Sequence, residues 1–394
     1  MPKSSSPHAS TTTSHESPRV ITNQHPINAV YMRGGTSKGV FFHARDLPPA
    51  GPARDAILLR VMGSPDPLQI DGMGGTYSST SKVVVVDEPH DGTVTYWFGQ
   101  VDITTPHIDW QGNCGNLTTA VGPFVIEEGL VAAHEPFTTL MLHNGNTDTR
   151  IEAEVPVANG SFQVTGAHVV DGVPGTGSAV VTRYLAPVGK TTGQLLPLGP
   201  TTDVEMPDGQ SIPVSVVDAS SVYAFVRASD LGTDMTTADP ATLNTDVTLL
   251  ERLEHLRSAL AMRLGRVEKP ADAATQSATV PRLIVFAPGD DSTHVVARAV
   301  MMGVFHRALP MTGALCLAAA AHTPGTLVAA SLETPAPWEV VIGHPRGTAT
   351  VEVAAEQHGS TVTIQSLGVT RTARRIMDGR VYVEQYDEIT GSLF

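Results

Sequence analysis

The sequence contains few cysteines and few charged residues, and its acidic residues outnumber its basic ones. Cys114 and Cys316 are the two cysteines among 394 residues, and they lack the paired spacing of a zinc site or a disulfide framework. Charged residues make up 16% of the chain, and the formal net charge is −14. A protein this acidic does not offer the basic face that nucleic acid or an anionic bilayer requires. Neither is therefore expected as a partner.

Long apolar runs and metal-ligand spacings are also missing. No stretch approaches the ~20 consecutive apolar residues of a membrane-spanning helix. The histidines include no His-x-His or His-Glu-x-x-His pair. We therefore expect neither a bound metal nor an organic cofactor.

Residues 1–25 are rich in Ser, Thr, Pro and His, and their basic residues are Lys3 and Arg19. They have neither the apolar core of a signal peptide nor the Arg-rich pattern of a transit peptide. We predict a disordered tail on a cytoplasmic protein. The chain as a whole is 41% hydrophobic with a mean hydropathy near zero, which is typical of a globular protein, and it is long enough for two domains.

Two short polar motifs stand where a strand or a helix is predicted to begin. Lys82 ends the polar residues 74–82 and opens a run of four valines, which is typical of a buried strand. Asn113 precedes the apolar residues 117–128, and Gly129 follows them. This pattern predicts a helix capped by Asn113, with Cys114 in its first turn. Unpaired N–H groups at a helix start can hold a carboxylate or favour a thiolate.

A third motif, Arg-Gly-Gly-Thr-Ser-Lys-Gly at residues 33–39, lies between strands predicted at 27–30 and 40–43. Its glycines let the backbone approach a ligand closely, and Arg33 and Lys38 supply positive charge. The alternative is a tight hairpin whose basic side chains are only solvated.

The remaining pattern predicts a β-rich α+β protein of two halves, joined near the Pro- and Gly-rich loops at 172–177 and 187–199. We place the first domain at 26–190 and the second at 191–394, with the last residues free to return to the first. The predicted helices are 53–62, 249–264, 293–305 and 314–321. The predicted strands are 94–101, 138–142, 151–155, 162–164, 214–217, 223–226, 283–287, 339–342, 348–353 and 361–364.

An internal similarity supports the two halves. The Cys-Gly-Asn-Leu sequence at residues 114–117 matches Thr-Gly-Ala-Leu at 312–315, 198 residues later, and each opens an apolar helix. The pairing fits two similar domains whose central helices begin at one shared cleft. The alternative is a chance similarity between two helix starts made of small residues.

The ordered set of motifs resembles the PrpF family. It comprises residues 33–39, 71–75, 79–83, 113–116, 192–197, 312–314, 324–326, 371–374 and 377–379, and the match extends from about Ile27 to the C-terminus. The resemblance implies a diaminopimelate-epimerase-like fold with two pseudo-symmetric domains. Each domain would be a β-sheet barrel wrapped around a central helix, and the active site would lie in the cleft between them.

The resemblance also implies a cofactor-independent isomerase of 2-methylaconitate, methylitaconate, aconitate or 4-oxalomesaconate. Epimerases of this fold use one cysteine from each helix start, but the second position here is Thr312, so a two-thiol mechanism is not available. Lys82 falls on the family's catalytic lysine and would be the base, unless it is a strand-end lysine that reaches solvent. Cys114 would be a second acid or base, or an oriented hydrogen-bond donor. Cys316, one turn into an apolar helix, is expected in the core.

The expected substrate is an unsaturated di- or tricarboxylate, converted by a 1,3-allylic proton shift or by cis–trans isomerisation. The family's Asn-Pro segment is replaced by Ser220 and Ser221, which leaves the identity of the acid open. The alternative function is an accessory protein for an iron–sulfur dehydratase. The resemblance leaves open whether the chain forms a homo-oligomer. The expected substrate-binding residues are Arg33, Ser37, Lys38, Ser79, Thr80, Ser81, Asn113, Gly115, Asn116, Thr312, Gly313 and Arg371.

Overall fold

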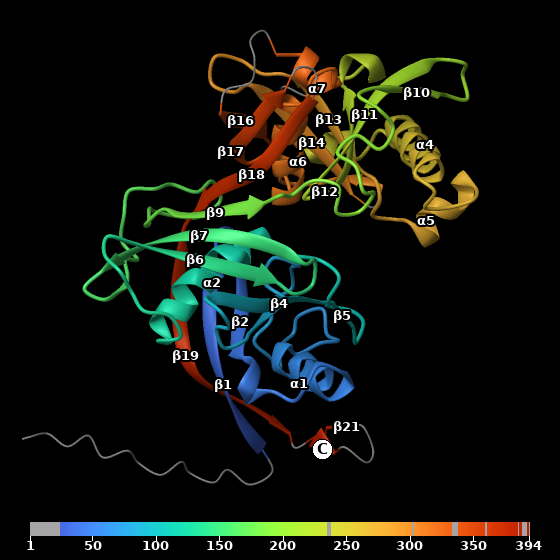
Figure 1. Cartoon of the computed structure of the whole chain (residues 1–394). Coiled ribbons are helices and arrows are strands. Elements are labelled where there is room, and N and C mark those ends of the chain that lie inside the picture. The colour runs from blue at the N-terminus through green and yellow to red at the C-terminus, as the bar shows by residue number, and fades with distance from the viewer. Residues whose placement is uncertain are drawn as a thin grey trace, which may run out of the picture.

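The computed structural model describes residues 24–234, 238–301, 303–332, 338–358, 361–384, 386–387 and 392–393. Residues 1–23 of the predicted tail lie outside the described residues, whereas Gln24 and His25 already belong to the first strand. Figure 1 shows two bodies, the lower built mainly from the first half of the chain and the upper mainly from the second.

Seven strands of the first half pair in the order β1-β2-β3-β4-β6-β7-β9. Successive pairs are antiparallel, parallel, antiparallel, parallel, antiparallel and antiparallel. The elements of this half are β1 (Gln24–Gly34), β2 (Ser37–His43), α1 (Pro52–Met62), β3 (Lys82–Val86), β4 (Thr93–Val101), β5 (Ile108–Asp109), α2 (Gly115–Glu127), β6 (Phe137–Asn144), β7 (Thr149–Ala158), β8 (Ser161–Phe162) and β9 (Val180–Leu185).

Seven strands of the second half, β11-β12-β13-β14-β16-β17-β18, pair with the same succession of directions. The elements are β10 (Thr202–Glu205), β11 (Ser211–Ala219), β12 (Ser221–Arg227), α3 (Pro240–Leu243), α4 (Val247–Arg263), α5 (Ala273–Gln276), β13 (Arg282–Pro288), β14 (Val295–Met301), β15 (Val304–Phe305), α6 (Met311–Ala321), α7 (Leu327–Ala330), β16 (Glu339–His344), β17 (Gly347–His358) and β18 (Thr361–Arg371). They are followed by β19 (Ala373–Glu384), β20 (Tyr386–Asp387) and β21 (Ser392–Leu393).

The central helix of each half is buried on every side. Between Gly115 and Ile126, α2 has no charged residue, and α6 consists of small and apolar residues, as a helix enclosed by a sheet requires. Both helices pack in one continuous core with the inner faces of the two sheets. The outer faces are covered by α1 in the first half and by α4 in the second.

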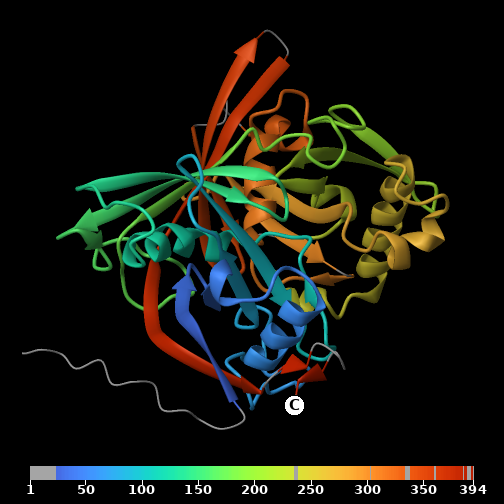
Figure 2. The same cartoon turned by 60° about the horizontal axis from the view of Figure 1, so that its bottom comes forward.

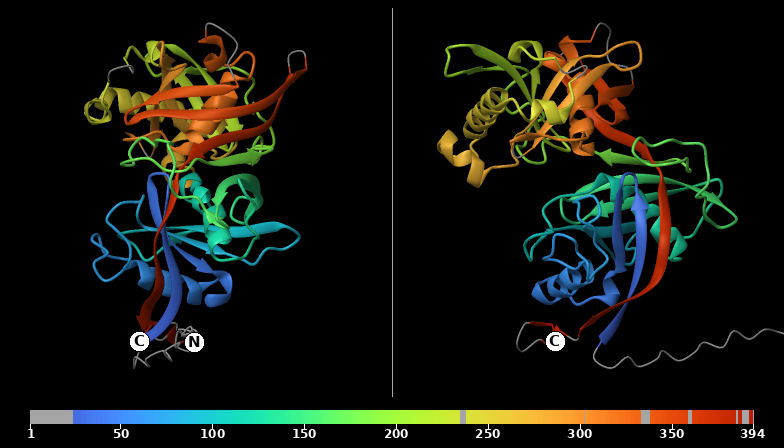
Figure 3. Two further views of the ribbon diagram at one scale, coloured as in Figure 1. Left: turned by 90° about the vertical axis from the view of Figure 1, so that its left-hand side faces the viewer. Right: turned by 180° about the vertical axis from the view of Figure 1, so that it is seen from behind.

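The two halves exchange strands where they meet. The end strand β9 of the first half pairs with β18 of the second, and Val188, just beyond β9, bridges to Ala219 of β11. After β18 the chain continues into β19, which runs antiparallel to β1 along its whole length. Figures 2 and 3 show β19 passing from the second body down the side of the first. Each half therefore receives a closing strand from the other.

The α+β, epimerase-like architecture is confirmed, and most predicted strands and helices are present with longer bounds. The helix predicted over 293–305 is wrong, because residues 295–301 form β14. This strand is Val- and Ala-rich and buried on both faces of the sheet, so its sequence lacks the alternation that separates a strand from a buried helix. Within the described part of the chain, no helix combines the length and apolar character needed to cross a bilayer.

Candidate active site

The start of α2 contacts the start of α6. A Cβ atom at Gly115 would overlap the sulfur of Met311 and would lie 2.8 Å from the hydroxyl oxygen of Tyr184. The Tyr184 hydroxyl in turn donates to Met311 Sδ at 3.7 Å. Cys114 precedes Gly115 in the sequence and Thr312 follows Met311, so both residues lie beside this contact. The two helix starts that are similar in sequence are therefore also neighbours in space.

Cys114 is the N-cap residue of α2, so the helix begins one position later than predicted. Its side chain is half-buried, and its Sγ lies 3.9 Å from Ser37 Oγ. No side chain caps the helix, so the prediction that Asn113 does so is wrong. Asn113 Oδ1 instead accepts hydrogen bonds from Tyr96 at 3.2 Å and from Thr118 at 3.1 Å. Within the described part of the chain, the first N–H groups of α2 are thus left without a side-chain acceptor.

Lys82 lies on the inner face of the sheet, toward α2. Successive side chains of a strand point to opposite faces of the sheet, so Lys82 and Val84 share a face that Val83 does not. Val84 packs in the core around α2, whereas Val83 packs in the outer cluster. Its side chain is buried, and Nζ donates to Gln100 Oε1 at 2.5 Å and lies 4.9 Å from the centre of the Phe98 ring. Among the described residues, Lys82 has no ion pair. The alternative of a strand-end lysine reaching solvent is therefore excluded.

The glycine-rich turn packs against the first turn of α2. A Cβ atom at Gly34 would overlap the carbonyl oxygen of Asn116, and one at Gly35 would overlap the side-chain oxygen of the same residue. Asn116 Nδ2 also donates to Thr36 Oγ1 at 3.0 Å and to Ser37 Oγ at 3.5 Å. The close approach that we expected these glycines to allow is therefore an approach to a helix, and it fixes Ser37 beside Cys114.

Arg33 and Lys38 lie on the opposite face of this hairpin. They pair with each other in register, and Lys38 Nζ is 5.5 Å from the ring centre of Tyr31, which packs in the outer cluster with α1. Arg33 Nη1 donates to the carbonyl oxygens of Gly35 at 3.0 Å and Thr372 at 2.8 Å. Burial and the nearby Arg374 lower the pKa of Arg33. The structure thus does not bring these two cations to Cys114.

In the loop from Ser79 to Ser81, the side chains of Thr80 and Ser81 are hydrogen-bonded to earlier residues of the same segment. Ser81 is fully buried and its Oγ accepts from Gln69 Nε2 at 2.7 Å. Thr80 Oγ1 donates to the carbonyl oxygens of Gly75 and Tyr77. Ser79 is half-buried, and its carbonyl oxygen accepts from Lys38 N at 2.9 Å. Of the three, Ser79 is the residue whose side chain makes no hydrogen bond within the described part of the chain.

Comparison with known proteins identifies the family. The family model described as PrpF protein matches residues 24–384. The chain belongs to the PrpF family. It is 37% identical over 382 residues to the 3-methylitaconate isomerase of Eubacterium barkeri, covering 93% of this chain and 99% of that one. It is 38% identical over 395 residues to the 2-methyl-aconitate isomerase of Shewanella oneidensis, covering 93% and 98%.

Solved structures agree with this assignment. A crystal structure of methylitaconate-delta-isomerase superimposes with a TM-score of 0.83 at 36% identity, over 92% of this chain and 97% of that one. A hydroxyproline epimerase from Agrobacterium vitis shares the fold, with a TM-score of 0.54 at 13% identity over 94% and 95% of the two chains. This PrpF-family protein is an enzyme of the isomerase class.

In this PrpF-family site, Arg371 is the predicted cation that lies near the helix starts. It ends β18, and its Nη1 donates to the carbonyl oxygen of Thr370 at 2.8 Å. Burial lowers the pKa of Arg371, while Tyr184 and Asp171 oppose that shift. Burial raises the pKa of Tyr184, so its hydroxyl stays protonated, and Cys114 and Arg371 both act on it electrostatically. Tyr184 therefore interacts both with Arg371 and with Cys114 at the start of α2.

Thr312 lies at the α6 start with its hydroxyl engaged. Thr312 Oγ1 is 3.0 Å from the hydroxyl of Tyr223, and a Cβ at Gly313 would lie 3.3 Å from the same ring. Cys316 is fully buried, its Sγ lies 3.3 Å from the carbonyl oxygen of Val217, and burial raises its pKa. The second helix thus presents a hydroxyl and no available thiol.

Sequence reasoning missed four residues that build this site. They are Gln100, Tyr184, Tyr223 and Met311. Three lie on strands, where only the pairing register shows which of them face inward; the alternation of Tyr96, Phe98 and Gln100 along β4 was the available signal. Among the described residues, no group of three or more potential metal ligands is present.

Proposed function

We propose that this protein isomerises an unsaturated di- or tricarboxylate of the aconitate type, with Lys82 as the base. The observation that carries the proposal is the position of Lys82. Its amine is buried on the face of the sheet toward α2, held by an amide oxygen and an aromatic ring, neither of which carries a negative charge. The relatives named as isomerases of methylitaconate and methylaconitate act on acids of this class.

The reaction begins when the Lys82 amine removes a proton from a carbon next to the alkene. The electron pair moves through the conjugated carboxylate or ketone to give an extended enolate. The uncapped N–H groups of α2 and the Arg371 guanidinium stabilise the negative charge. The ammonium then returns the proton to the far allylic carbon and completes a double-bond shift. Rotation before reprotonation at the original carbon gives cis–trans isomerisation instead.

Cys114 has two roles open to it in this scheme. Its half-buried thiol at the helix start either transfers a proton or donates a hydrogen bond to the substrate. Thr312 does not supply a second base, because its hydroxyl is bonded to Tyr223 and no base adjoins it among the described hydrogen bonds. Protons therefore leave and return on the same face of the substrate.

The test is deuterium incorporation in heavy water with aconitate, 2-methylaconitate, methylitaconate and 4-oxalomesaconate. The parent protein should exchange label into at least one acid and convert it. Lys82→Ala should lower kcat by roughly a thousandfold, a typical contribution of a general base. Lys190→Ala, which changes an exposed lysine outside the site, is the matched control and should keep parent activity.

No label in any of the four acids would reject the isomerase proposal and favour an accessory role beside an iron–sulfur dehydratase. Activity of Lys82→Ala within about tenfold of the parent would remove this lysine from the mechanism.

A further inference from the structure

Arg282 occupies in the second half the place that Lys82 occupies in the first. Each is the first residue of the third strand in the seven-strand order of its half, and the two are 200 positions apart in the sequence. In β3, Val83 pairs with Val40 of the parallel neighbour, and in β13, Leu283 pairs with Ala224 of the parallel neighbour. The helix starts of the two halves are 198 positions apart. The equivalence therefore follows from both topology and register.

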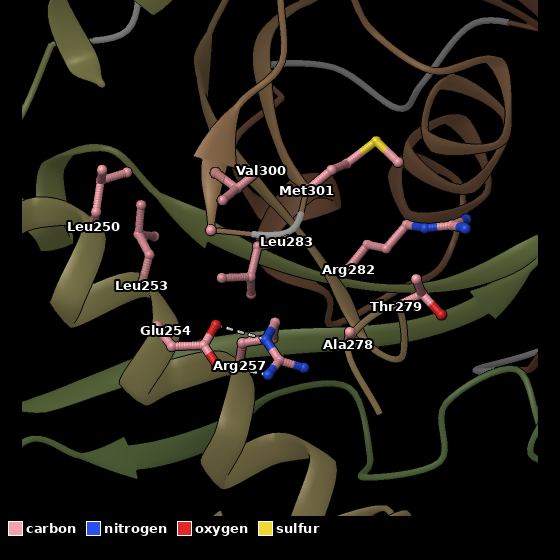
Figure 4. A pocket seen from close by; sticks show the side chains of 11 residues that line it. Leu250, Leu253, Glu254, Arg257, Ala278, Thr279, Arg282, Leu283, Val300 and Met301 are labelled. Atoms are coloured by element: carbon pink, nitrogen blue, oxygen red, sulfur yellow. Dashed lines mark hydrogen bonds and ion pairs between the residues drawn. The ribbon is translucent and has the colours of Figure 1, made fainter. Parts of the chain in front are cut away.

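Arg282 lies on the inner face of its sheet, toward α6. Ile284, two residues along β13, packs in the shared core, whereas Leu283 packs in the outer cluster with α4. Figure 4 shows the Arg282 side chain extending away from Leu253 and Leu283, which line a small outer pocket. That pocket also contains the Glu254–Arg257 ion pair of 2.6 Å. Arg282 also borders this pocket, but its guanidinium contacts Ser221 and Tyr223 of the neighbouring strand β12.

The hydrogen-bonding capacity of the Arg282 guanidinium is only partly used within the described part of the chain. Nη1 donates to Ser221 Oγ at 3.0 Å. Nε is buried and has no hydrogen-bond partner, and among the described residues no carboxylate pairs with this arginine. An unsatisfied buried donor costs free energy that a bound acceptor would recover. The edge formed by Nε and Nη2 has the geometry for two parallel hydrogen bonds to one carboxylate.

Arg282 is linked to the α6 start through one side chain. Its guanidinium carbon lies 5.9 Å from the ring centre of Tyr223, and the Tyr223 hydroxyl is 3.0 Å from Thr312 Oγ1. Met311, the neighbour of Thr312, contacts Gly115 of α2. The arginine therefore belongs to the same junction of helix starts as Cys114, but on the side of the second half.

We propose that Arg282 binds a second carboxylate of the substrate, across the junction from Lys82. The proposal rests on the proposed function, because it assigns one end of the same acid. Lys82 faces the carbon that loses its proton, and Arg282 holds a carboxylate remote from that carbon. This arrangement makes Arg282 a residue that selects acids bearing the additional carboxylate.

The experiment compares ligand pairs that differ in one carboxylate. Binding of tricarballylate, a saturated tricarboxylate, and of glutarate, its analogue without the middle carboxylate, is measured by calorimetry on the parent and on Arg282→Gln. We expect Arg282→Gln to weaken tricarballylate binding by about ten- to a hundredfold and glutarate binding by less than threefold, because one charge-assisted bidentate contact is lost. The affinity of Arg282→Lys for tricarballylate should lie between those of the parent and of Arg282→Gln, because lysine keeps the positive charge but lacks the two parallel N–H donors of a guanidinium.

Arg227→Gln is the matched control. This arginine ends the neighbouring strand β12 and lies 3.9 Å from Asp230, so its loss should leave both affinities unchanged. For any acid that the parent turns over, Arg282→Gln should raise KM more than it lowers kcat. Equal weakening of both ligands, or none, would overturn the proposal, and Arg282→Lys gives the same comparison if Arg282→Gln does not fold.

The binding measurement separates this proposal from the isomerase proposal. If the parent protein exchanges no label but binds tricarballylate through Arg282, the proposed carboxylate site is supported and the isomerase proposal is rejected. A parent that turns over an acid equally well after Arg282→Gln would retain the catalysis and reject the site.

Discussion

At the scale of single residues, existing hydrogen bonds decide which cations are available to a ligand. Arg33 and Lys38 belong to a conspicuous motif, yet one is bonded to Gly35 and Thr372 and the other lies over Tyr31. Arg371 ends a strand near the helix starts with one carbonyl partner, and no ion pair involves it among the described residues. Position on the sheet, more than membership of a motif, thus separates the structural Arg33 from Arg371, the arginine that we propose binds the substrate.

A pair of substitutions tests this distinction. Arg371→Gln should raise KM for the substrate by at least tenfold with a smaller change in kcat, because it removes a charge-assisted contact with a carboxylate. Arg33→Gln should leave KM within about threefold and lower the melting temperature instead, because it breaks the link between the hairpin and Thr372. Steady-state kinetics and thermal unfolding of both variants supply the readouts. The reverse pattern would return Arg33 to the binding site.

The sequence was sufficient to place Lys82 at the start of a strand and Cys114 at the start of a helix, but not to predict the surroundings of either. Valine runs and a small-residue helix start are local signals, so the elements that carry these residues follow from short segments. Gln100, Tyr184 and Tyr223 reach the site through pairings with distant strands. Alternation within β2 does place Ser37 and Lys38 on opposite faces, and it was the signal that could have separated them.

At the scale of elements, the contact between the glycine turn and α2 positions the thiol. Gly34 approaches the carbonyl oxygen of Asn116 closely, and a Cβ there would also lie 3.2 Å from Ala120 Cβ. Both neighbours belong to a buried helix that cannot move away without repacking the core. The turn therefore fixes the distance between the start of α2 and the sheet that carries Lys82.

Gly34→Ala should consequently destabilise the protein by about 1–3 kcal/mol, the usual cost of overpacking. It should also reduce kcat, because it displaces Cys114 relative to Lys82. Gly112→Ala is the control, since a Cβ at Gly112 would meet no atom within 4 Å. Urea unfolding and turnover measured on both variants distinguish them. Equal stability of the two variants would show that the hairpin and helix can separate at no cost.

The helix predicted over 293–305 is wrong because a local sequence pattern does not show which distant residues will pair with a segment. Residues 295–301 lie between β13 and β16, so both of their faces are covered. Their Val and Ala side chains satisfy a buried strand or a buried helix equally. Only the partners on either side decide between the two, and these are contributed by residues far away in the chain.

At the scale of the whole molecule, strand exchange makes the two halves depend on each other. β1 lacks one neighbour unless β19 returns from the second half, and β18 lacks one unless β9 reaches across from the first. An unpaired strand edge in a buried position leaves backbone groups without partners. The boundary proposed between residues 190 and 191 therefore separates two segments that each lack a closing strand.

Fragments 1–190 and 191–394 should not fold stably when expressed apart. Circular dichroism should show no cooperative thermal transition for either alone, and mixing or co-expression should restore one, because each fragment then supplies the strand that the other lacks. The intact chain is the reference. A cooperative transition in either isolated fragment, near the melting temperature of the intact chain, would mean that the exchanged strands are dispensable.

The exchanged strands also bear on how two halves with the same strand order can carry different residues at equivalent positions. In a symmetric pair of identical half-length chains, the partner copy would have to supply each closing strand, and every substitution would appear twice. Joining the halves in one gene keeps the exchange within a single chain and frees each copy to diverge. A single chain can therefore carry Lys82 in one half and Arg282 at the equivalent position of the other, and likewise Cys114 and Thr312. The division of labour that we propose for Lys82 and Arg282 thus depends on the connectivity as much as on the residues.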